Sequence, residues 1–187
     1  MRVIAGIYRS RTLRSLKGQA LRPTSDRLRE TLFNIVGPGL PGSTFVDLYA
    51  GTGAVGIEAL SRGALLAMFV ERHEPSANLI QRNLESLGVG EEAEILIVDV
   101  LRALKRLEAR HVRAQFIFLD PPYALKDEYE RTLDYLGNSS LLAPGGRIIA
   151  EHLKKHKLPE RFGGLELARR VEQGDAALSF YRPAKVE

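Results

Sequence analysis

Thr44-Phe45-Val46-Asp47-Leu48-Tyr49 leads directly into Ala50-Gly51-Thr52-Gly53-Ala54-Val55-Gly56. The apolar first half predicts a buried strand, and residues 54–61 predict a helix. Glycines let the backbone turn sharply and approach a ligand closely, while the amino end of the helix offers free N–H groups. This strand, turn and helix therefore predict a Rossmann-like unit with a ligand at its glycine turn.

Further strands and helices alternate after this unit. Apolar, β-branched runs at 66–71, 93–99, 115–120 and 146–151 predict strands, with helices at 75–87, 100–109 and 127–136 between them. Such alternation indicates parallel β-α-β units. Two more strands, 165–171 and 177–181, have only a short Gly174-Asp175 link between them, so the last strand must run antiparallel. We expect an α/β, Rossmann-like fold with a seven-stranded, mostly parallel sheet and an antiparallel last strand.

The front of the chain is basic. The first 22 residues contain no acid and six basic residues: Arg2, Arg9, Arg11, Arg14, Lys17 and Arg22. The net charge of the whole chain is +4, so the remainder is slightly acidic. A basic arm of this kind is typical of polyanion binding, although a solvated tail is an alternative. Residues 2–8 and 11–16 could form a hairpin, and a helix is expected at 26–36.

Length and composition favour one cysteine-free domain. The chain has 187 residues, 44% of them hydrophobic and none of them cysteine, which excludes disulfides and thiolate chemistry. We divide the expected domain into a basic arm or hairpin (1–22), a pocket-closing helix (23–37) and a Rossmann-like core (43–187). The apolar runs are too short to span a bilayer. We expect a monomeric cytoplasmic protein with no membrane partner and no metal.

Acidic residues follow three successive strands. Asp47, Glu71 and Asp99 fall at strand ends, where ligands of open α/β sheets bind. Gly51-x-Gly53-x-x-Gly56 with Glu71 twenty positions on also fits a dinucleotide site, so NAD binding stays open. A carboxylate at Asp47 favours the cationic ammonium and sulfonium of S-adenosylmethionine and would repel a diphosphate. Alternatively, these acids cap helices. We assign the cofactor to Asp47, Tyr49, Gly51, Thr52, Gly53, Glu71, Arg72 and Asp99.

A second motif, Asp120-Pro121-Pro122-Tyr123, follows the fourth strand. Consecutive prolines fix the backbone and leave carbonyl acceptors. The Asp120 carboxylate and the Pro121 carbonyl could hold the two hydrogens of an exocyclic base amine, whose lone pair would then point at a methyl donor. Pro122 would fix the loop, and Tyr123 could stack on an extruded base. The motif therefore predicts catalysis on a nucleic-acid amine.

Together the two motifs resemble the amino-group methyltransferases that carry an Asn/Asp-Pro-Pro-Tyr/Phe signature. Met1-Arg-Val-Ile-Ala-Gly6, Arg22-Pro-Thr-Ser-Asp-Arg-Leu-Arg-Glu-Thr-Leu-Phe-Asn34 and Gly56-Ile-Glu-Ala-Leu-Ser-Arg-Gly63 narrow this resemblance to the bacterial small-subunit ribosomal RNA methyltransferase D family. In two places the arm departs from that family: Ile7 and Ser10 stand where a basic residue and a glycine are expected.

The resemblance implies a class I S-adenosylmethionine-dependent fold and methylation of a guanine N2 amine in 16S rRNA of the small ribosomal subunit. It also implies that the segment around Thr24 helps to close the cofactor pocket. We assign RNA contacts to Arg9, Arg11, Arg14 and Arg22. Three alternatives stay open at this point: methylation of adenine N6 in DNA or RNA, an NAD-dependent oxidoreductase, and a non-catalytic RNA-binding factor.

Overall fold

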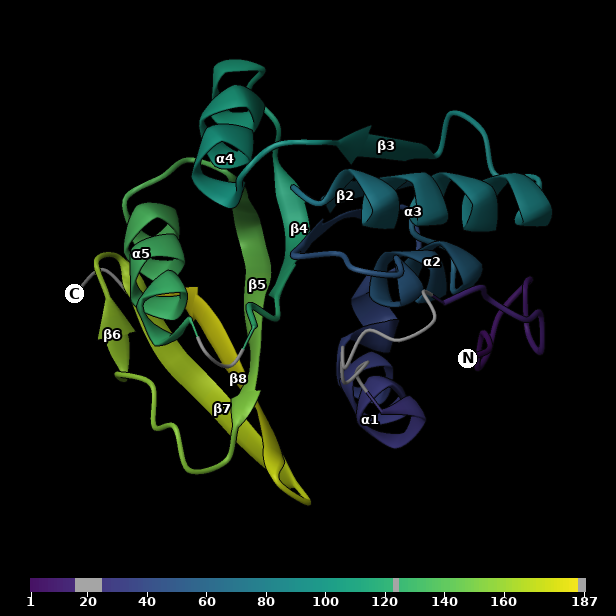
Figure 1. Cartoon of the computed structure of the whole chain (residues 1–187). Coiled ribbons are helices and arrows are strands. Elements are labelled where there is room, and N and C mark those ends of the chain that lie inside the picture. Colours follow the sequence, from purple (N-terminus) through teal and green to yellow (C-terminus); the bar gives the residue numbers. More distant parts are fainter. Residues whose placement is uncertain (16–24, 123–124, 185–187) are drawn as a thin grey trace. The chain divides into compact units, whose positions relative to one another are not determined.

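The computed structural model describes residues 1–15, 25–122 and 125–184 (Figure 1). Residue contacts divide the chain into two compact units, Met1–Asp99 and Val100–Glu187. Each unit contains part of the predicted β-α alternation.

Among its described residues, the first unit holds the arm, four helical segments and three parallel strands. Its elements are α1 (Asp26–Val36), η1 (Gly37–Gly39), β1 (Thr44–Leu48), α2 (Ala54–Ser61), β2 (Leu66–Val70), α3 (Glu74–Leu87) and β3 (Ala93–Leu96). The strand order within the unit is β3-β2-β1, with both pairs parallel. The Ser25 side chain caps α1 by accepting the Leu28 N–H, and Gly88 ends α3 in the left-handed conformation.

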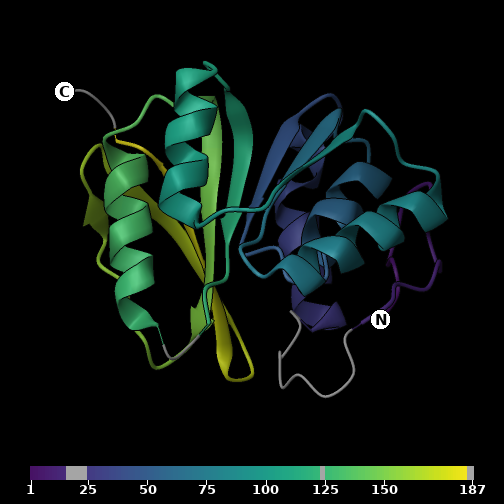
Figure 2. The same ribbon diagram turned by 45° about the horizontal axis from the view of Figure 1, so that its top comes forward.

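The second unit holds two helices and five strands. Its elements are α4 (Val100–Ala109), β4 (Ala114–Leu119), α5 (Lys126–Gly137), β5 (Leu142–Leu153), β6 (Arg161–Phe162), β7 (Leu165–Gln173) and β8 (Ala176–Pro183). The strand order is β4-β5-β8-β7-β6, in which β4 and β5 are parallel and the other pairs antiparallel. The antiparallel last strand is confirmed. Figure 2 shows α4 and α5 together on one side of these strands.

The predicted count of seven strands is wrong, since the described residues form eight. The additional strand, β6, has two residues and pairs with the start of β7 across Gly163-Gly164. Two residues are too few to show an alternating pattern, so this strand could not be predicted from the sequence.

The arm reverses direction as predicted, but it is held differently from a regular hairpin. One isolated antiparallel bridge joins Arg2 and Thr12, and backbone bonds join Val3 to Arg11 and to Ser10. Ser10 has φ of 66°, the left-handed conformation that favours the glycine expected at this position. The predicted second strand of the hairpin ends at residue 16, outside the described residues.

No helix within residues 1–15, 25–122 and 125–184 is both long and apolar enough to cross a membrane. In the same ranges, no three His, Asp or Glu side chains are grouped as potential metal ligands.

Candidate active site

The glycine turn lies between β1 and α2 and is tightly wound. Tyr49, Gly51 and Gly53 all have positive φ, of 64°, 56° and 76°. The Gly53 N–H closes the turn by donating to the Ala50 carbonyl at 2.7 Å. A methyl group placed on Gly51 would meet only the Tyr49 carbonyl oxygen, at 3.9 Å. The protein thus leaves one side of Gly51 open for the close approach of a ligand.

Asp47 holds the beginning of α2 from the preceding strand. Its side chain is buried, and Oδ2 accepts the Gly56 N–H at 3.0 Å. Gly56 lies in the first turn of α2, where backbone N–H groups have no partner within the helix. The alternative interpretation of Asp47 as a helix cap therefore describes its hydrogen bond to the Gly56 N–H, and that bond also fixes the glycine turn.

Glu71 binds the same turn from the end of β2. One carboxylate oxygen accepts the Gly51 N–H at 2.9 Å and the other accepts the His73 N–H at 2.7 Å. Each oxygen of an ionised carboxylate has two lone pairs, so both can accept a further hydrogen bond. The half-buried Glu71 side chain can therefore accept ligand hydroxyl groups while it stays bonded to the turn.

The other predicted cofactor residues of this unit lie close to the turn in sequence or at neighbouring strand ends. The Glu71 N–H donates to the Leu96 carbonyl at 3.1 Å, which brings the ends of β2 and β3 together. Asp99 follows β3 and is half-buried, and Arg72 is exposed. Thr52 donates its hydroxyl to Met1 Sδ at 3.9 Å. Thr24 lies outside the described residues.

The predicted catalytic loop follows β4 in the second unit. Asp120 is half-buried, Pro121 buried and Pro122 exposed. The Leu125 N–H donates to the Pro122 carbonyl at 2.8 Å. Tyr123 lies outside the described residues.

Sequence reasoning missed Tyr129, which supports this loop from α5. Its buried hydroxyl donates to the Glu151 carbonyl at 2.9 Å and approaches the Pro121 carbonyl at 3.4 Å. The ring packs edge-on against His156, with centroids 5.2 Å apart. Burial lowers the pKa of the neighbouring His152, and the charges of Arg170 and His156 act in the same direction. The sequence signal was slight, a tyrosine on the buried face of a helix eight residues after Pro121.

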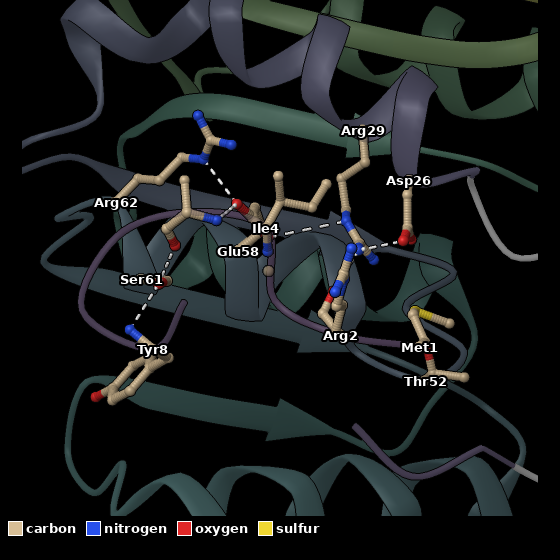
Figure 3. Close-up of polar contacts among 12 residues, drawn as sticks. Met1, Arg2, Ile4, Tyr8, Asp26, Arg29, Thr52, Glu58, Ser61 and Arg62 are labelled. Carbon is tan, nitrogen blue, oxygen red and sulfur yellow. Dashed lines mark hydrogen bonds and ion pairs between the residues drawn. The ribbon is translucent and has the colours of Figure 1, made fainter. Parts of the chain in front are cut away.

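A second set of residues missed by sequence reasoning anchors the arm (Figure 3). The fully buried Glu58 of α2 accepts the N–H groups of Ile4 and Ala5 at 2.8 and 3.0 Å. It also pairs with Arg62 at 2.8 Å and lies 3.9 Å from Arg29 Nε. Arg29, likewise buried, donates to the Arg2 carbonyl at 2.6 Å. Burial lowers the pKa of Arg29, whereas Glu58 and Asp26 act in the opposite direction.

The predicted RNA-contacting arginines are placed in two ways. Arg9 and Arg14 are exposed. Arg11 is exposed too, but its guanidinium donates to the Ser86 carbonyl of α3 at 2.9 Å. Arg22 lies outside the described residues.

Comparison with known proteins identifies the family. Residues 1–182 match the family model described as Conserved hypothetical protein 95. The Bacillus subtilis protein YlbH is 36% identical over 97% of this chain and 98% of its own length. Ribosomal RNA small subunit methyltransferase D of Haemophilus influenzae is 36% identical over 84% of this chain and 81% of its own. This chain belongs to the methyltransferase D family.

The solved structures agree with this methyltransferase D membership. The Escherichia coli protein yhhF superposes with a TM-score of 0.85 at 29% identity, covering 98% of this chain and 97% of its own. The expected Rossmann-like class I methyltransferase fold is thereby confirmed, apart from the strand count.

Proposed function

We propose that this member of the methyltransferase D family transfers a methyl group from S-adenosylmethionine to the N2 amine of a guanine in 16S rRNA. One observation carries the proposal: Asp120-Pro121-Pro122-Tyr123 follows β4 in a chain of this family, which also has an acid-flanked glycine turn after β1. A cytoplasmic location and a monomeric state stay predictions of the sequence.

The catalytic loop would hold and orient the base amine. The Asp120 carboxylate and the Pro121 carbonyl accept its two hydrogens, which draws the nitrogen toward tetrahedral geometry and aims its lone pair at the methyl carbon. As the carbon–nitrogen bond forms, the carbon–sulfur bond would break and release S-adenosylhomocysteine, and the amine would lose one proton to solvent. Pro122 keeps the loop rigid, and Tyr123 stacks on the base. Orientation of this kind contributes on the order of 7–11 kcal/mol in well-aligned reactions.

The first unit would bind the cofactor, which supplies an electrophilic methyl group when bound. Glu71 accepts the ribose hydroxyls, Asp99 accepts the adenine amino group, and the open side of Gly51 admits the ligand to the backbone. The remaining contacts come from Asp47, Tyr49, Thr52, Gly53, Arg72 and Thr24. The sequence left NAD open as an alternative, and membership of a methyltransferase family favours S-adenosylmethionine.

The assignment of 16S rRNA as the substrate rests on the name of a relative and on the positive charge of the arm. A relative named ribosomal RNA small subunit methyltransferase D covers most of this chain, and the arm carries the exposed cations Arg9 and Arg14. Cations of this kind favour a phosphate backbone. An exocyclic amine is also present at adenine N6, so substrate identity needs a product analysis.

The test is transfer of labelled methyl from S-adenosylmethionine to small subunits that lack the modification, to free 16S rRNA and to DNA. We expect label in ribosomal RNA, recovered after digestion as N2-methylguanosine, and at least a hundredfold loss of rate in Asp120→Ala, on the order of the loss of one key transition-state group. Asp127→Ala, which removes an exposed acid from the first turn of α5, should retain the wild-type rate. Label in DNA alone, or N6-methyladenosine as the product, would overturn the substrate assignment.

Cofactor identity has a separate test. S-adenosylhomocysteine should raise the melting temperature, and NADH should leave it unchanged. The reverse result would restore the oxidoreductase alternative.

A further inference from the structure

Asn83 of α3 bonds to the arm and to the glycine turn at the same time. Its Oδ1 accepts the Arg14 N–H at 2.8 Å. Its Nδ2 donates to the Arg14 carbonyl at 3.2 Å and to the Thr52 carbonyl at 3.1 Å. The side chain is fully buried. One planar amide therefore joins the backbone of a proposed RNA-contacting residue to the backbone of a proposed cofactor-contacting residue.

The arm belongs to the packed core of the first unit. Val3 and Leu13 are buried in the same apolar cluster as Ala50 and Ala54, which flank the glycine turn. Figures 1 and 2 show the arm, in purple, beside α2 and α3. The arm and the turn thus share apolar contacts as well as the Asn83 amide.

The side chains that hold the arm differ in their other hydrogen-bond partners. Glu58 and Ser61 hold residues 4–8 of the arm from α2 itself, through the N–H groups of Ile4, Ala5 and Tyr8. Asn83 holds the arm from a different helix and also bonds to Thr52. A change at Ser61 therefore loosens the arm, whereas a change at Asn83 disturbs the arm and the turn together.

We propose that Asn83 is a positioning residue that couples the basic arm to the cofactor turn, so that RNA on the arm and S-adenosylmethionine at the turn strengthen each other's binding. This inference rests on the proposed function. RNA bound to the arm further restrains the Arg14 backbone and with it the orientation of the amide that holds Thr52. Coupling between two binding sites is reciprocal, so the cofactor must strengthen RNA binding by the same factor.

The test compares wild type, Asn83→Asp and Ser61→Ala by calorimetric titration with S-adenosylhomocysteine, with and without a 16S rRNA fragment. Aspartate has nearly the same shape as asparagine and still accepts the Arg14 N–H, but it loses both donors and turns an anion toward two carbonyls. We expect Asn83→Asp to weaken binding of S-adenosylhomocysteine about tenfold without RNA, as for a buried group left unsatisfied. Ser61→Ala should bind within about twofold of wild type, since its lost contacts lie away from the turn.

The titrations with RNA distinguish coupling between the two sites from a general loss of stability. RNA should tighten binding of S-adenosylhomocysteine several-fold in wild type and in Ser61→Ala, and leave it unchanged in Asn83→Asp. A merely structural Asn83 would lower stability without removing the response to RNA. Should Asn83→Asp fail to fold, Asn83→Ser retains a small hydroxyl donor and should lose the same response to RNA.

The possible results distinguish a failure of the coupling through Asn83 from a failure of the proposed methyltransferase function. Wild type that does not bind S-adenosylhomocysteine defeats the proposed function. Wild type that binds it, with Asn83→Asp showing the same affinity and the same response to RNA, defeats the coupling. Equal losses in Asn83→Asp and Ser61→Ala also overturn it, because arm docking in general would then be responsible.

Discussion

Gly56 shows how one missing methyl group decides the packing of α2 on β2. A Cβ at this position would lie 2.3 Å from Cε1 of the Phe69 ring, which is fully buried. Replacing glycine by alanine within a helix normally stabilises by up to about 1 kcal/mol. Overpacking costs about 1–3 kcal/mol, because a buried ring must shift to admit the extra methyl group. We therefore expect Gly56→Ala to lower the free energy of unfolding by about 1–2 kcal/mol, measured by urea denaturation.

A matched control for Gly56→Ala is available at Gly90. The φ of this residue lies outside the left-handed region, and a Cβ there would meet only Glu92 Oε2, at 3.8 Å. Gly90→Ala should therefore leave stability unchanged or raise it slightly. Equal effects at the two positions would show that the contact with Phe69 does not limit the space around Gly56.

A single-atom change at Tyr129 tests whether this residue supports the proposed catalytic loop. Tyr129→Phe keeps the ring against His156 but removes the hydroxyl that bonds to Glu151 and approaches Pro121. With the Pro121 carbonyl less firmly placed, we expect the methyl-transfer kcat to fall about tenfold, as about 1.4 kcal/mol of lost transition-state stabilisation implies. Single-turnover kinetics with saturating cofactor would measure it.

Tyr135→Phe is the control, because it removes a hydroxyl from the same helix. That hydroxyl donates to Glu108 Oε2 at 2.6 Å. Burial and the hydrogen bond to Glu108 raise the pKa of Tyr135 to about 12, so the hydroxyl stays protonated at neutral pH. This variant should lose some stability and keep its kcat. A kcat unchanged in both variants would remove Tyr129 from the support of the loop.

At the level of elements, the pairing of β5 with β8 buries a histidine and should make stability depend on pH. His152 of β5 is fully buried and hydrogen-bonded to Ser179 of β8 at 2.8 Å. Its pKa lies below the ordinary 6.5, chiefly because of burial. As the pH falls below about 6.5, the unfolded chain takes up a proton that the folded protein does not. The stabilising contribution is therefore complete above that pH and is lost toward lower pH.

This pH dependence can be measured as the urea midpoint between about pH 8 and pH 5.5. Wild type should lose more stability over this interval than His152→Gln, which has no proton to take up. The exposed His111 supplies the comparison, and His111→Asn should keep the wild-type pH profile. A His152→Gln protein with the wild-type profile would contradict the assignment.

The elements that could be predicted are those with a local signal. Residues 26–36 form the expected helix because Ser25 caps it and its apolar residues recur on one face. Residues 54–61 form the other expected helix directly after the glycine turn. The glycine turn and Asp120-Pro121-Pro122 were likewise recognisable from adjacent residues. Asn83 could not be found in this way, because its partners are 31 and 69 residues away. The arm was expected to be a hairpin, but Glu58, Ser61 and Asn83 hold it in place of a strand ladder.

At the level of the whole molecule, charge is unevenly distributed along a chain with a net charge of +4. If the arm attracts RNA, the position of the cations should matter more than their number. Arg9 and Arg14 are exposed, and Asn83 binds Arg14 through its backbone, so both side chains can be changed without touching that contact. Arg11 is left in place because its guanidinium bonds to Ser86.

The double variant Arg9→Gln with Arg14→Gln should bind RNA more weakly and with a shallower salt dependence. Each phosphate contact contributes about 0.7 to 0.9 to the slope of log affinity against log salt, so the loss of two contacts should reduce the slope by about 1.5. Lys105→Gln with Arg106→Gln removes the same charge from exposed positions of α4. Titration of a labelled 16S rRNA fragment at several salt concentrations would compare them. A slope reduced equally in both double variants would mean that net charge, not the arm, attracts the RNA. A reduction confined to the variant of the arm, with binding of S-adenosylhomocysteine unchanged, would assign the phosphate contacts to the arm.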